Sequence, residues 1–287
     1  MIRKIKINTL REALHKLKAD GKSIGFVPTM GALHEGHLSL ITASMQLADV
    51  TVASVFINPT QFNDPKDLKK YPKNLKSDLA MLSSHHTHIV FTPTAKEIYP
   101  ANEKIDEVSI PLNGLDSLME GKYRPGHFKG VVQVVNKLLN IVEPDHLFMG
   151  QKDFQQLTII RHMIKTLSLS VKLHSSPTIR ENAGLAMSSR NVRLSHKTRA
   201  KACIIYHTLR EVKNIFRDES PDALQRFALE KLTIAPFHPE YFEIVDGFTL
   251  QPVADWNQHN FIVACTAVRV EGIRLIDNII LKDSSWV

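Results

Sequence analysis

Two histidines stand three residues apart where the chain passes from one apolar run to the next. They are His34 and His37 of the stretch PTMGALHEGHLSL (residues 28–40), and Gly31 and Gly36 accompany them. Glycine lets the backbone approach a ligand closely, and the N–H groups at the start of a helix attract anions. Imidazoles at positions i and i+3 share one face of that first turn. As hydrogen-bond donors they suit phosphate oxygens and the charge that develops when a phosphoanhydride bond breaks.

A metal site and a purely structural role are the alternatives for this pair. A metal ion needs a further ligand nearby, and the sequence has no HExxH-like arrangement to supply one. An isolated HxxH more often marks two surface or capping histidines. A strand, a glycine turn, the histidine pair and a helix in succession favour anion binding over both alternatives.

The composition is that of a soluble globular protein. The chain has 287 residues, of which 43% are hydrophobic and 23% charged, enough for one large domain or two unequal ones. No apolar run approaches the ~20 residues of a membrane helix, and the charged N-terminus lacks the apolar segment of a secretory signal. The only cysteines, Cys203 and Cys265, form no CxxC pair. We therefore expect a cytoplasmic protein with no membrane partner, no disulfide framework and no thiolate zinc site.

The net charge of +7 raises the question of nucleic-acid binding. The lysines and arginines are dispersed, however, and acids and prolines interrupt their densest group, in residues 64–78. A dispersed excess indicates a solvated surface or a field that attracts anionic substrates. We expect no nucleic-acid partner.

Strand-like and helical patterns alternate over the first half of the chain. This alternation predicts βαβ units, and hence a parallel sheet with helices on both faces. In such folds ligands bind beyond the carboxyl ends of the strands. The predicted strands are 23–29, 50–58, 88–93, 146–150 and 170–177, and the predicted helices are 34–49, 75–84, 127–142 and 153–167.

The pattern changes after about residue 177, where a polar stretch leads into two helices and then two strands. This change predicts a second, smaller α+β domain. The helices are expected over about 196–217 and after the sequence SPDAL, and the strands over 241–247 and 259–270. The predicted domains are residues 1–176 and 177–287.

The histidine turn resembles the HxGH signature of the nucleotidyltransferase superfamily, which has a Rossmann-like fold. As a whole, residues 28–40 resemble the ATP-binding motif of the pantothenate synthetase (pantoate–β-alanine ligase) family. The resemblance extends from about residue 23 to residue 278. Six further stretches agree in the same order: FINPTQF (56–62), YRPGHFKGVVQVVNKLLNIVEPD (123–145), GQKDFQQL (150–157), GLAMSSRN (184–191), EIVD (243–246) and RLIDN (274–278).

This resemblance implies an enzyme that uses ATP and Mg²⁺ to activate pantoate as a pantoyl adenylate, releasing pyrophosphate. The amine of β-alanine then attacks the adenylate, giving pantothenate and AMP. The resemblance also implies a homodimer formed through the first domain, and a second domain that closes over ATP.

The resemblance further implies which residues form the site, and their chemistry suits these roles. His34, His37 and Lys152 are the implied catalytic residues, because imidazole donors and an ammonium group can stabilise phosphate charge. Gln61 and Gln156 are the implied pantoate or β-alanine contacts, since a neutral amide suits a hydroxy acid. The implied ATP-binding residues are Met30, Gly31, Ala32, Leu33, His34, Glu35, Gly36, His37, Gly150, Gln151, Lys152, Asp153, Ile179, Met187, Ser188, Ser189 and Arg190.

Two further residues are candidates for the site. Asp78 could bind Mg²⁺, because one carboxylate plus substrate phosphates is a usual magnesium arrangement, although a solvated helix residue is the alternative. Arg124 could face a carboxylate or a phosphate. Two positions depart from the family pattern: Met149 where phenylalanine is usual, and Ala183 where an acid is usual.

Two other functions compete with the ligase. One is a different HxGH nucleotidyltransferase, acting on a phosphopantetheine or an aminoacyl group, and the NPTQF and GQKDFQQ stretches speak against it. The other is a basic RNA-binding protein, and the chain lacks the aromatic motif of an RNA-binding sheet.

Overall fold

A computed structural model describes residues 1–100, 108 and 110–283 of the chain. Contacts group the chain into two compact units. The predicted domain boundary, between residues 176 and 177, lies one residue before the start of the last segment of the second unit. The second unit also contains two short segments from earlier in the chain, which the prediction assigned to the first domain. The first unit is Met1–Asn113, Arg124–Gly150 and Ile159–Pro177, and the second is Gly114–Tyr123, Gln151–Thr158 and Thr178–Val287.

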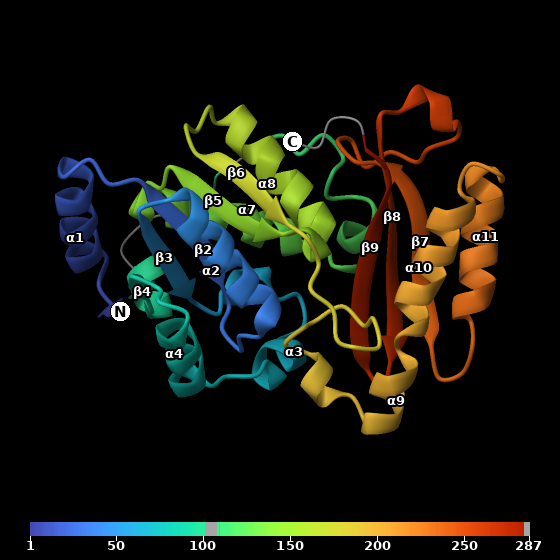
Figure 1. The fold of residues 1–287 in the computed structure, drawn as a ribbon, viewed down its shortest axis with the longest axis horizontal. Helices are drawn as coiled ribbons and strands as arrows, with labels where there is room; N and C mark the ends of the chain where they lie inside the picture. The colour runs from blue at the N-terminus through green and yellow to red at the C-terminus, as the bar shows by residue number, and fades with distance from the viewer. Residues whose placement is uncertain (101–107, 109, 284–287) are drawn as a thin grey trace. The chain divides into compact units, whose positions relative to one another are not determined.

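The first unit is built on a six-stranded parallel sheet (Figure 1). Its strands are β1 (Ile2–Lys4), β2 (Ile24–Thr29), β3 (Val50–Val55), β4 (Ile89–Phe91), β5 (His146–Gly150) and β6 (Lys172–Ser176). They lie in the order β1-β4-β3-β2-β5-β6. The chain moves from β2 to β3 on one side and from β5 to β6 on the other, so the direction of winding reverses between β2 and β5. The predicted parallel sheet is confirmed.

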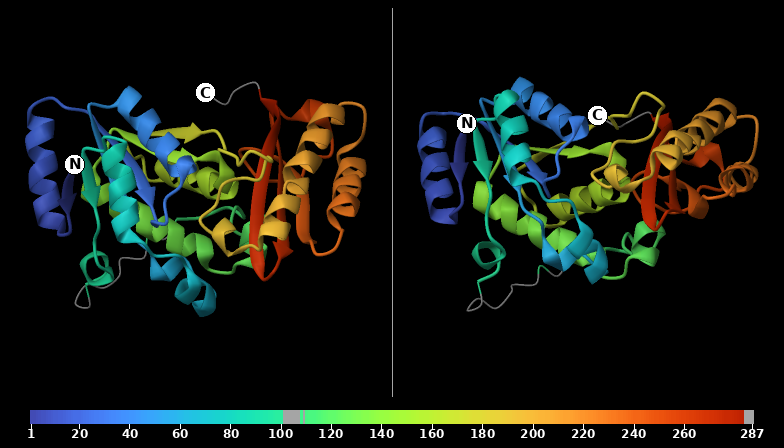
Figure 2. Two further views of the ribbon diagram at one scale, coloured as in Figure 1. Left: turned by 60° about the horizontal axis from the view of Figure 1, so that its bottom comes forward. Right: turned by 90° about the horizontal axis from the view of Figure 1, so that it is seen from below.

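Helices cover both faces of this sheet. They include α1 (Ile7–Ala19), α2 (Glu35–Leu47), α4 (Leu75–Ser84) and α7 (His127–Val142), with the shorter η1 (Pro59–Gln61), α3 (Pro65–Lys70) and α5 (Ala95–Ile98). Helices α2 and α4 lie on one face and α7 on the opposite one, where it contacts α1 (Figure 2). The apolar residues predicted along one face of α7 are all buried: Val131, Val134, Val135, Leu138 and Leu139.

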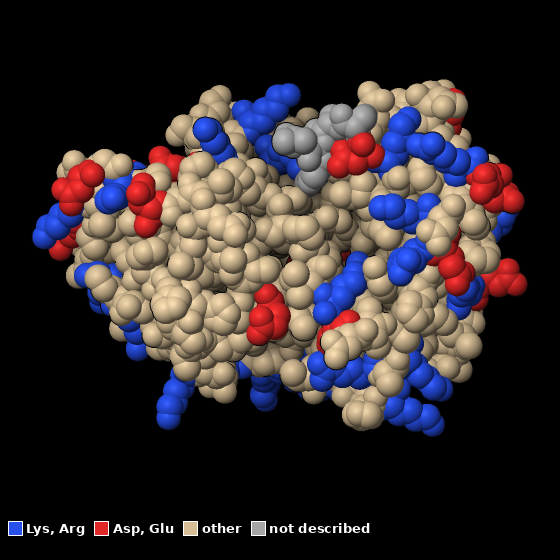
Figure 3. Space-filling view, viewed as in Figure 1, with Lys and Arg blue, Asp and Glu red and all other residues tan. Residues whose placement is uncertain are grey.

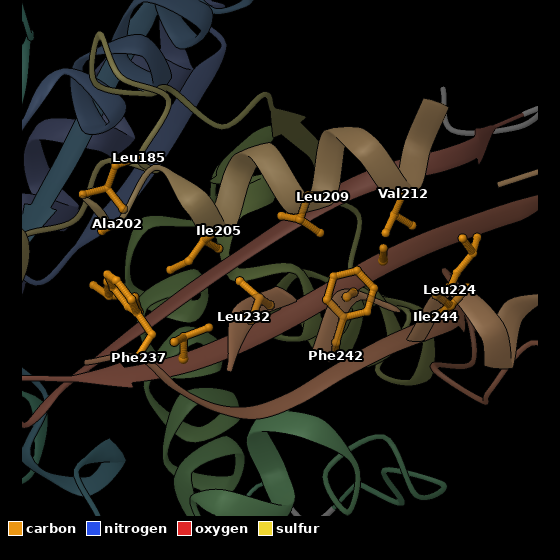
Figure 4. Packing of buried hydrophobic residues seen from close by; sticks show 14 of the residues in the cluster. Leu185, Ala202, Ile205, Leu209, Val212, Leu224, Leu232, Phe237, Phe242 and Ile244 are labelled. Atoms are coloured by element: carbon orange, nitrogen blue, oxygen red, sulfur yellow. The ribbon is translucent and has the colours of Figure 1, made fainter. Parts of the chain in front are cut away.

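The second unit has a three-stranded antiparallel sheet in the order β7-β8-β9. Its strands are β7 (His238–Asp246), β8 (Phe261–Val270) and β9 (Ile273–Asp283), and its helical segments are α6 (Met119–Tyr123), η2 (Gln151–Asp153), η3 (Asn191–Arg193), α9 (His196–Lys201), α10 (Ile204–Ile215), α11 (Pro221–Leu232) and η4 (Trp256–Gln258). Helix α8 (Phe154–Thr166) has residues in both units. Apolar side chains of α10 and α11 pack on the sheet, with Ile205, Leu209 and Phe242 at the centre of this core (Figure 4).

A buried ionic network fixes the segment 114–123 to this sheet. Arg274 of β9 pairs with the carboxylates of Glu120 and Glu240, and the Tyr241 hydroxyl donates to Glu120 at 2.8 Å. Burial, together with the charge of Glu120, raises the pKa of Tyr241 well above its ordinary value, so the phenol stays protonated as the donor. Removing one partner would leave an uncompensated buried charge, which is strongly destabilising.

The secondary structure differs from the sequence prediction in several elements. Strands β1 and β9, helix α1 and the short helices α3, α5 and α6 were not predicted. The single helix expected over about 196–217 is two helices, α9 and α10. The N–H of Ile205 bonds to the carbonyl of Ala202, three residues back, which tightens the turn between them and interrupts the α-helical ladder.

The distribution of charged residues can be followed on one face of the molecule. On the face shown in Figure 3, lysines and arginines lie among acidic and uncharged residues. Several form exposed ion pairs, such as Lys6 with Glu97 and Arg199 with Glu181. Among the described residues, none of the helices combines the length and apolarity that a membrane crossing requires.

Two histidines from neighbouring strands meet on the first unit's sheet. Nδ1 of His146 lies 2.9 Å from Nε2 of His174, and the His174 ring stacks on Phe148 with 4.9 Å between centroids. Burial, and then the charges of His146 and Lys172, lower the pKa of His174. The folded chain therefore favours the neutral imidazole.

We predict that His174 makes the protein less stable in mild acid. The unfolded chain binds a proton at this residue near the ordinary pKa of 6.5, whereas the folded chain does so only at lower pH. The contribution of neutral His174 to stability is therefore complete when the pH is above the pKa of this residue in the unfolded chain. The contribution is lost as the pH falls below that pKa. The free energy of unfolding, measured by urea denaturation, should fall less between about pH 7 and about pH 5 in His174→Gln than in the wild type.

His196→Gln, at an exposed position, is the matched control and should follow the wild type. A His174→Gln curve that runs parallel to the wild-type curve would contradict this prediction.

Candidate active site

The turn after β2 has a backbone conformation that one carboxylate holds in place. Gly31 and Ala32 both have positive φ, of 77° and 49°. The Asp78 carboxylate accepts from the N–H groups of Ala32 and Leu33, at 3.0 and 2.8 Å. A Cβ atom on residue 31 would lie 2.8 Å from Asp78 Oδ2, so glycine is needed there both for φ and for space.

His34 and His37 cap the helix that follows this turn. The His34 Nδ1 atom accepts from the Gly36 N–H at 3.1 Å, and the His37 Nδ1 atom accepts from the His34 N–H at 3.3 Å. An imidazole that accepts at Nδ1 is neutral and carries its proton on Nε2. The Nε2 atom of each ring is therefore a hydrogen-bond donor and has no lone pair with which to bind a metal. The centroids of the two rings are 4.1 Å apart.

The structure brings Gln61 next to this turn. Gln61 is 7% exposed, and its Nε2 donates to the Met30 sulfur at 2.8 Å. Its Oε1 accepts from Asn58 Nδ2 at 3.3 Å. With the amide oxygen bonded to Asn58, Gln61 presents its N–H₂ group on the side of Met30.

Asn58 and His127 support Gln61, and neither was predicted as a site residue. Asn58 is 1% exposed; its Nδ2 also donates to the Gly130 carbonyl, and its Oδ1 accepts from Tyr99 Oη at 3.0 Å. Nδ1 of His127 donates to the Gln61 carbonyl at 2.7 Å. A polar residue at the end of the apolar run 50–58 was the only signal in the sequence for Asn58.

Asp78 is the one carboxylate that was predicted for a metal. It is 2% exposed, and both of its oxygens already accept backbone N–H bonds. Within the part of the chain that the structure describes, no group of three or more His, Cys, Asp or Glu residues could hold a metal ion. The observed role of Asp78 is to hold the turn, and its role as a Mg²⁺ ligand stays a prediction.

In the second unit, Lys152 and Asp153 lie in the short helix η2. Nζ of Lys152 is 3.8 Å from Asp153 Oδ2, and the Lys152 side chain is largely buried. The carbonyl oxygens of Gln151 and Lys152 both accept from Asn278 Nδ2. Asn278 belongs to the RLIDN stretch, but no particular residue of that stretch was predicted for the site.

The segment from Ile179 to Arg190 is a loop held by backbone bonds. The Met187 N–H donates to the Ile179 carbonyl at 3.0 Å, and the Arg190 N–H donates to Ser188 Oγ at 3.2 Å. Asn191, 2% exposed, donates to the Glu181 carboxylate and to the Ala186 carbonyl. Met187, Ser188, Ser189 and Arg190 are all partly exposed in this braced turn.

Gln155 and Gln156 have different surroundings. The Gln155 amide is 3% exposed; it donates to the carbonyls of Leu115 and Leu118 and accepts from the Glu120 N–H. These bonds use the whole amide to hold segment 115–120. Gln156 is partly exposed, which fits the prediction that it, and not Gln155, contacts a ligand.

The remaining predicted positions lie close to these turns in the sequence. Gly150 ends β5, Glu35 begins α2, and Arg124 lies between α6 and α7. Of the two departures from the family pattern, Met149 is buried in β5, and Ala183 is exposed in the turn before Gly184.

Comparisons with known proteins agree over nearly the whole chain. The sequence profile of the family described as "Pantoate-beta-alanine ligase" matches residues 3–280. A protein named pantothenate synthetase from Azobacteroides pseudotrichonymphae is 46% identical over 275 residues, which cover 94% of this chain and 96% of that one. Another of the same name, from Porphyromonas gingivalis, is 45% identical over 278 residues, covering 96% and 98%.

Solved structures agree as well. The pantothenate synthetase of Thermus thermophilus is 38% identical, with a TM-score of 0.91, over 98% of this chain and 100% of that one. A pantoate-beta-alanine ligase from Francisella tularensis, complexed with beta-gamma ATP and beta-alanine, is 33% identical, with a TM-score of 0.79, over 98% of both chains.

We predict that Asp78→Asn loosens the turn between β2 and α2. The amide keeps one acceptor oxygen but turns an N–H₂ group toward a backbone N–H, so one of the two charged hydrogen bonds is lost. The free energy of unfolding should fall by about 2 kcal/mol. Hydrogen exchange at the amides of Ala32 and Leu33 should speed up more than exchange in the core strands.

Asp20→Asn, at an exposed helix end, is the control and should leave both amides protected as in the wild type. Wild-type exchange at Ala32 and Leu33 in the Asp78 variant would show that the carboxylate does not hold the turn.

Proposed function

The chain belongs to the pantoate–β-alanine ligase family, and we propose that its His34–His37 turn binds the ATP and that Gln61 binds the pantoate of this reaction. The enzyme condenses pantoate with β-alanine in an ATP-dependent reaction. Pantoate is first converted to a pantoyl adenylate with release of pyrophosphate. The β-alanine amine then attacks the acyl carbon, giving pantothenate and AMP.

The observation that carries the proposal is the hydrogen bonding of the two histidines. Because Nδ1 of each ring accepts a backbone N–H, Nε2 of each ring is a donor. Donors that are already oriented cost no reorganisation as charge builds up on the α-phosphate and pyrophosphate leaves. The N-terminus of α2, which the same two rings cap, adds a partial positive charge.

Gln61 supplies a donor for pantoate. Its N–H₂ group bonds to the Met30 sulfur, which is a weak acceptor. A carboxylate or hydroxyl oxygen of pantoate is a stronger acceptor and would replace the sulfur. Asn58 bonds to the amide oxygen and thereby keeps the N–H₂ end in place.

Residues of the second unit supply further phosphate contacts in this proposal. Lys152 brings an ammonium charge, and Arg190 brings a guanidinium next to the hydroxyls of Ser188 and Ser189. The remaining ATP contacts come from the backbone of the two braced turns, at Gly150, Gln151, Asp153, Ile179 and Met187. Gln156 is the proposed second pantoate contact.

Mg²⁺ accompanies ATP in this family of ligases and neutralises phosphate charge when it is bound. The buried Asp78, with both oxygens bonded to N–H groups, fits an anchor of the turn better than a metal ligand. We therefore expect the ion to be held mainly by the phosphates, as is usual for Mg²⁺.

The assembly and location are also proposals. We infer a homodimer in the cytoplasm from the family resemblance, and both cysteines of the chain are free thiols, which suits a reducing compartment. The family match over residues 3–280 decides against a different HxGH nucleotidyltransferase.

We predict that the protein exchanges pyrophosphate into ATP when Mg²⁺ and pantoate are present and β-alanine is omitted. Exchange that requires pantoate follows from a reversible adenylation step. The measurement is the incorporation of labelled pyrophosphate into ATP, with and without pantoate. Exchange that needs phosphopantetheine or an amino acid in place of pantoate would contradict the proposed substrate.

We predict that His37→Ala slows adenylate formation far more than it weakens pantoate binding. Loss of one preorganised donor at developing charge costs ~3 kcal/mol, or ~100-fold in rate. Single-turnover formation of the adenylate, with saturating pantoate, measures this step directly. Ser39→Ala, in the same helix turn, removes a hydroxyl that donates to the Gly36 carbonyl and serves as the control. A wild-type rate for His37→Ala would remove this residue from the mechanism.

A further inference from the structure

Asn278, in strand β9, holds the backbone of the turn that carries Lys152. Its Nδ2 group donates to the carbonyl oxygens of Gln151 and Lys152, at 3.0 and 2.9 Å. Its Oδ1 accepts from Gln151 Nε2 at 3.0 Å. Asn278 is 2% exposed, so water has little access to replace these bonds. A primary amide supplies both the N–H donors and the acceptor that this arrangement uses.

The turn itself needs this support. Helix η2 has three residues, Gln151–Asp153, and short 3₁₀ segments have weaker hydrogen-bond geometry than an α-helix. Lysine has a flexible four-carbon stem, so the place of its ammonium depends on where its backbone is held. Among the described residues, Lys152 forms one ion pair, with Asp153. This pair is long, with 3.8 Å between Lys152 Nζ and Asp153 Oδ2.

Asp277, the residue before Asn278, holds the loop from Ile179 to Arg190. This loop is the other segment of the second unit that is proposed to bind ATP. Asp277 accepts two bonds from Arg180, at 2.5 and 2.9 Å, and Arg180 also donates to the Gly184 carbonyl. The Arg180 guanidinium lies over the Tyr206 ring, 3.8 Å from its centroid. Two neighbouring residues of β9 thus anchor the turn of Lys152 and the loop that leads to Ser188.

We propose that Asn278 is a positioning residue for the adenylation step. It holds the backbone of Lys152 so that the ammonium group reaches the ATP phosphates, and it acts through Lys152 without contacting ATP itself. This inference rests on the proposed function of Lys152.

Asn278→Ala should lower kcat/KM for ATP by about 10- to 100-fold, because a shift of ~1 Å in a catalytic group can cost ~100-fold. The KM for pantoate should rise less than the KM for ATP, because Gln156 follows this turn in the chain, whereas Gln61, the first proposed pantoate contact, belongs to the first unit. Asn278→Ser, which keeps a short donor, should show a smaller loss. If Asn278→Ala does not fold, Asn278→Ser is measured in its place, and the same results support or contradict the inference.

Thr266→Val is the matched control for loss of a buried hydrogen bond. Thr266 is fully buried in β8, opposite Asp277 in the ladder, and its hydroxyl donates to the Tyr241 carbonyl at 2.8 Å. This variant should lose thermal stability and keep the wild-type kcat/KM for ATP. An equal fall in kcat/KM for ATP in both variants would show that Asn278 has only a general structural role.

A double-mutant cycle separates this inference from the proposed function. If Asn278 acts through Lys152, then Lys152→Ala combined with Asn278→Ala should be no slower in pyrophosphate exchange than Lys152→Ala alone. Equal losses from Asn278→Ala with and without the lysine would overturn the inference. A wild-type exchange rate in Lys152→Ala would instead overturn the proposed role of Lys152.

Discussion

The candidate site of the first unit depends on one carboxylate that faces two backbone N–H groups. Positive φ at Ala32 is unfavourable for a residue with a side chain, and the bonds from Ala32 and Leu33 to Asp78 offset that cost. The turn they stabilise brings His34 to the start of α2 as its N-cap. His37 then accepts from the His34 N–H, and the tautomer of both rings follows from these contacts.

Buried Asp and Asn side chains hold each of the turns proposed to bind substrate. Asp78 holds the turn after β2, Asn58 holds Gln61, Asn278 holds Lys152, and Asn191 holds the loop before η3. Turns that follow parallel strands have no ladder to stabilise them, so their backbone groups need partners from elsewhere. A buried amide or carboxylate provides several such bonds from one residue, and a ligand can then bind without first ordering the turn.

The apolar periodicity of the sequence was sufficient to predict most of the fold. Helices α4 and α7 and strand β5 have the predicted bounds, because their apolar patterns are long or their flanking residues are clear. Strand β9 was missed because Asp277 and Asn278, both buried, interrupt its apolar pattern. The residues that hold the site were missed for a related reason. Besides its bond to Gln61, Asn58 bonds to a group 72 residues away, and Asn278 bonds to a group 127 residues away, which no local pattern reveals.

The interleaving of the two units along the chain limits how such proteins can be recombined. Each unit is made of three separate segments, so a single crossover at residue 177 would not transfer a complete unit from one relative to another. A fragment that began at Thr178 would lack Glu120, and Arg274 would lose one of its two carboxylate partners. It would also lack the Gln151 and Lys152 carbonyls, leaving the Asn278 amide without its acceptors. Gene shuffling in this family should therefore favour exchanges that move residues 114–123 and 151–158 together with the C-terminal segment.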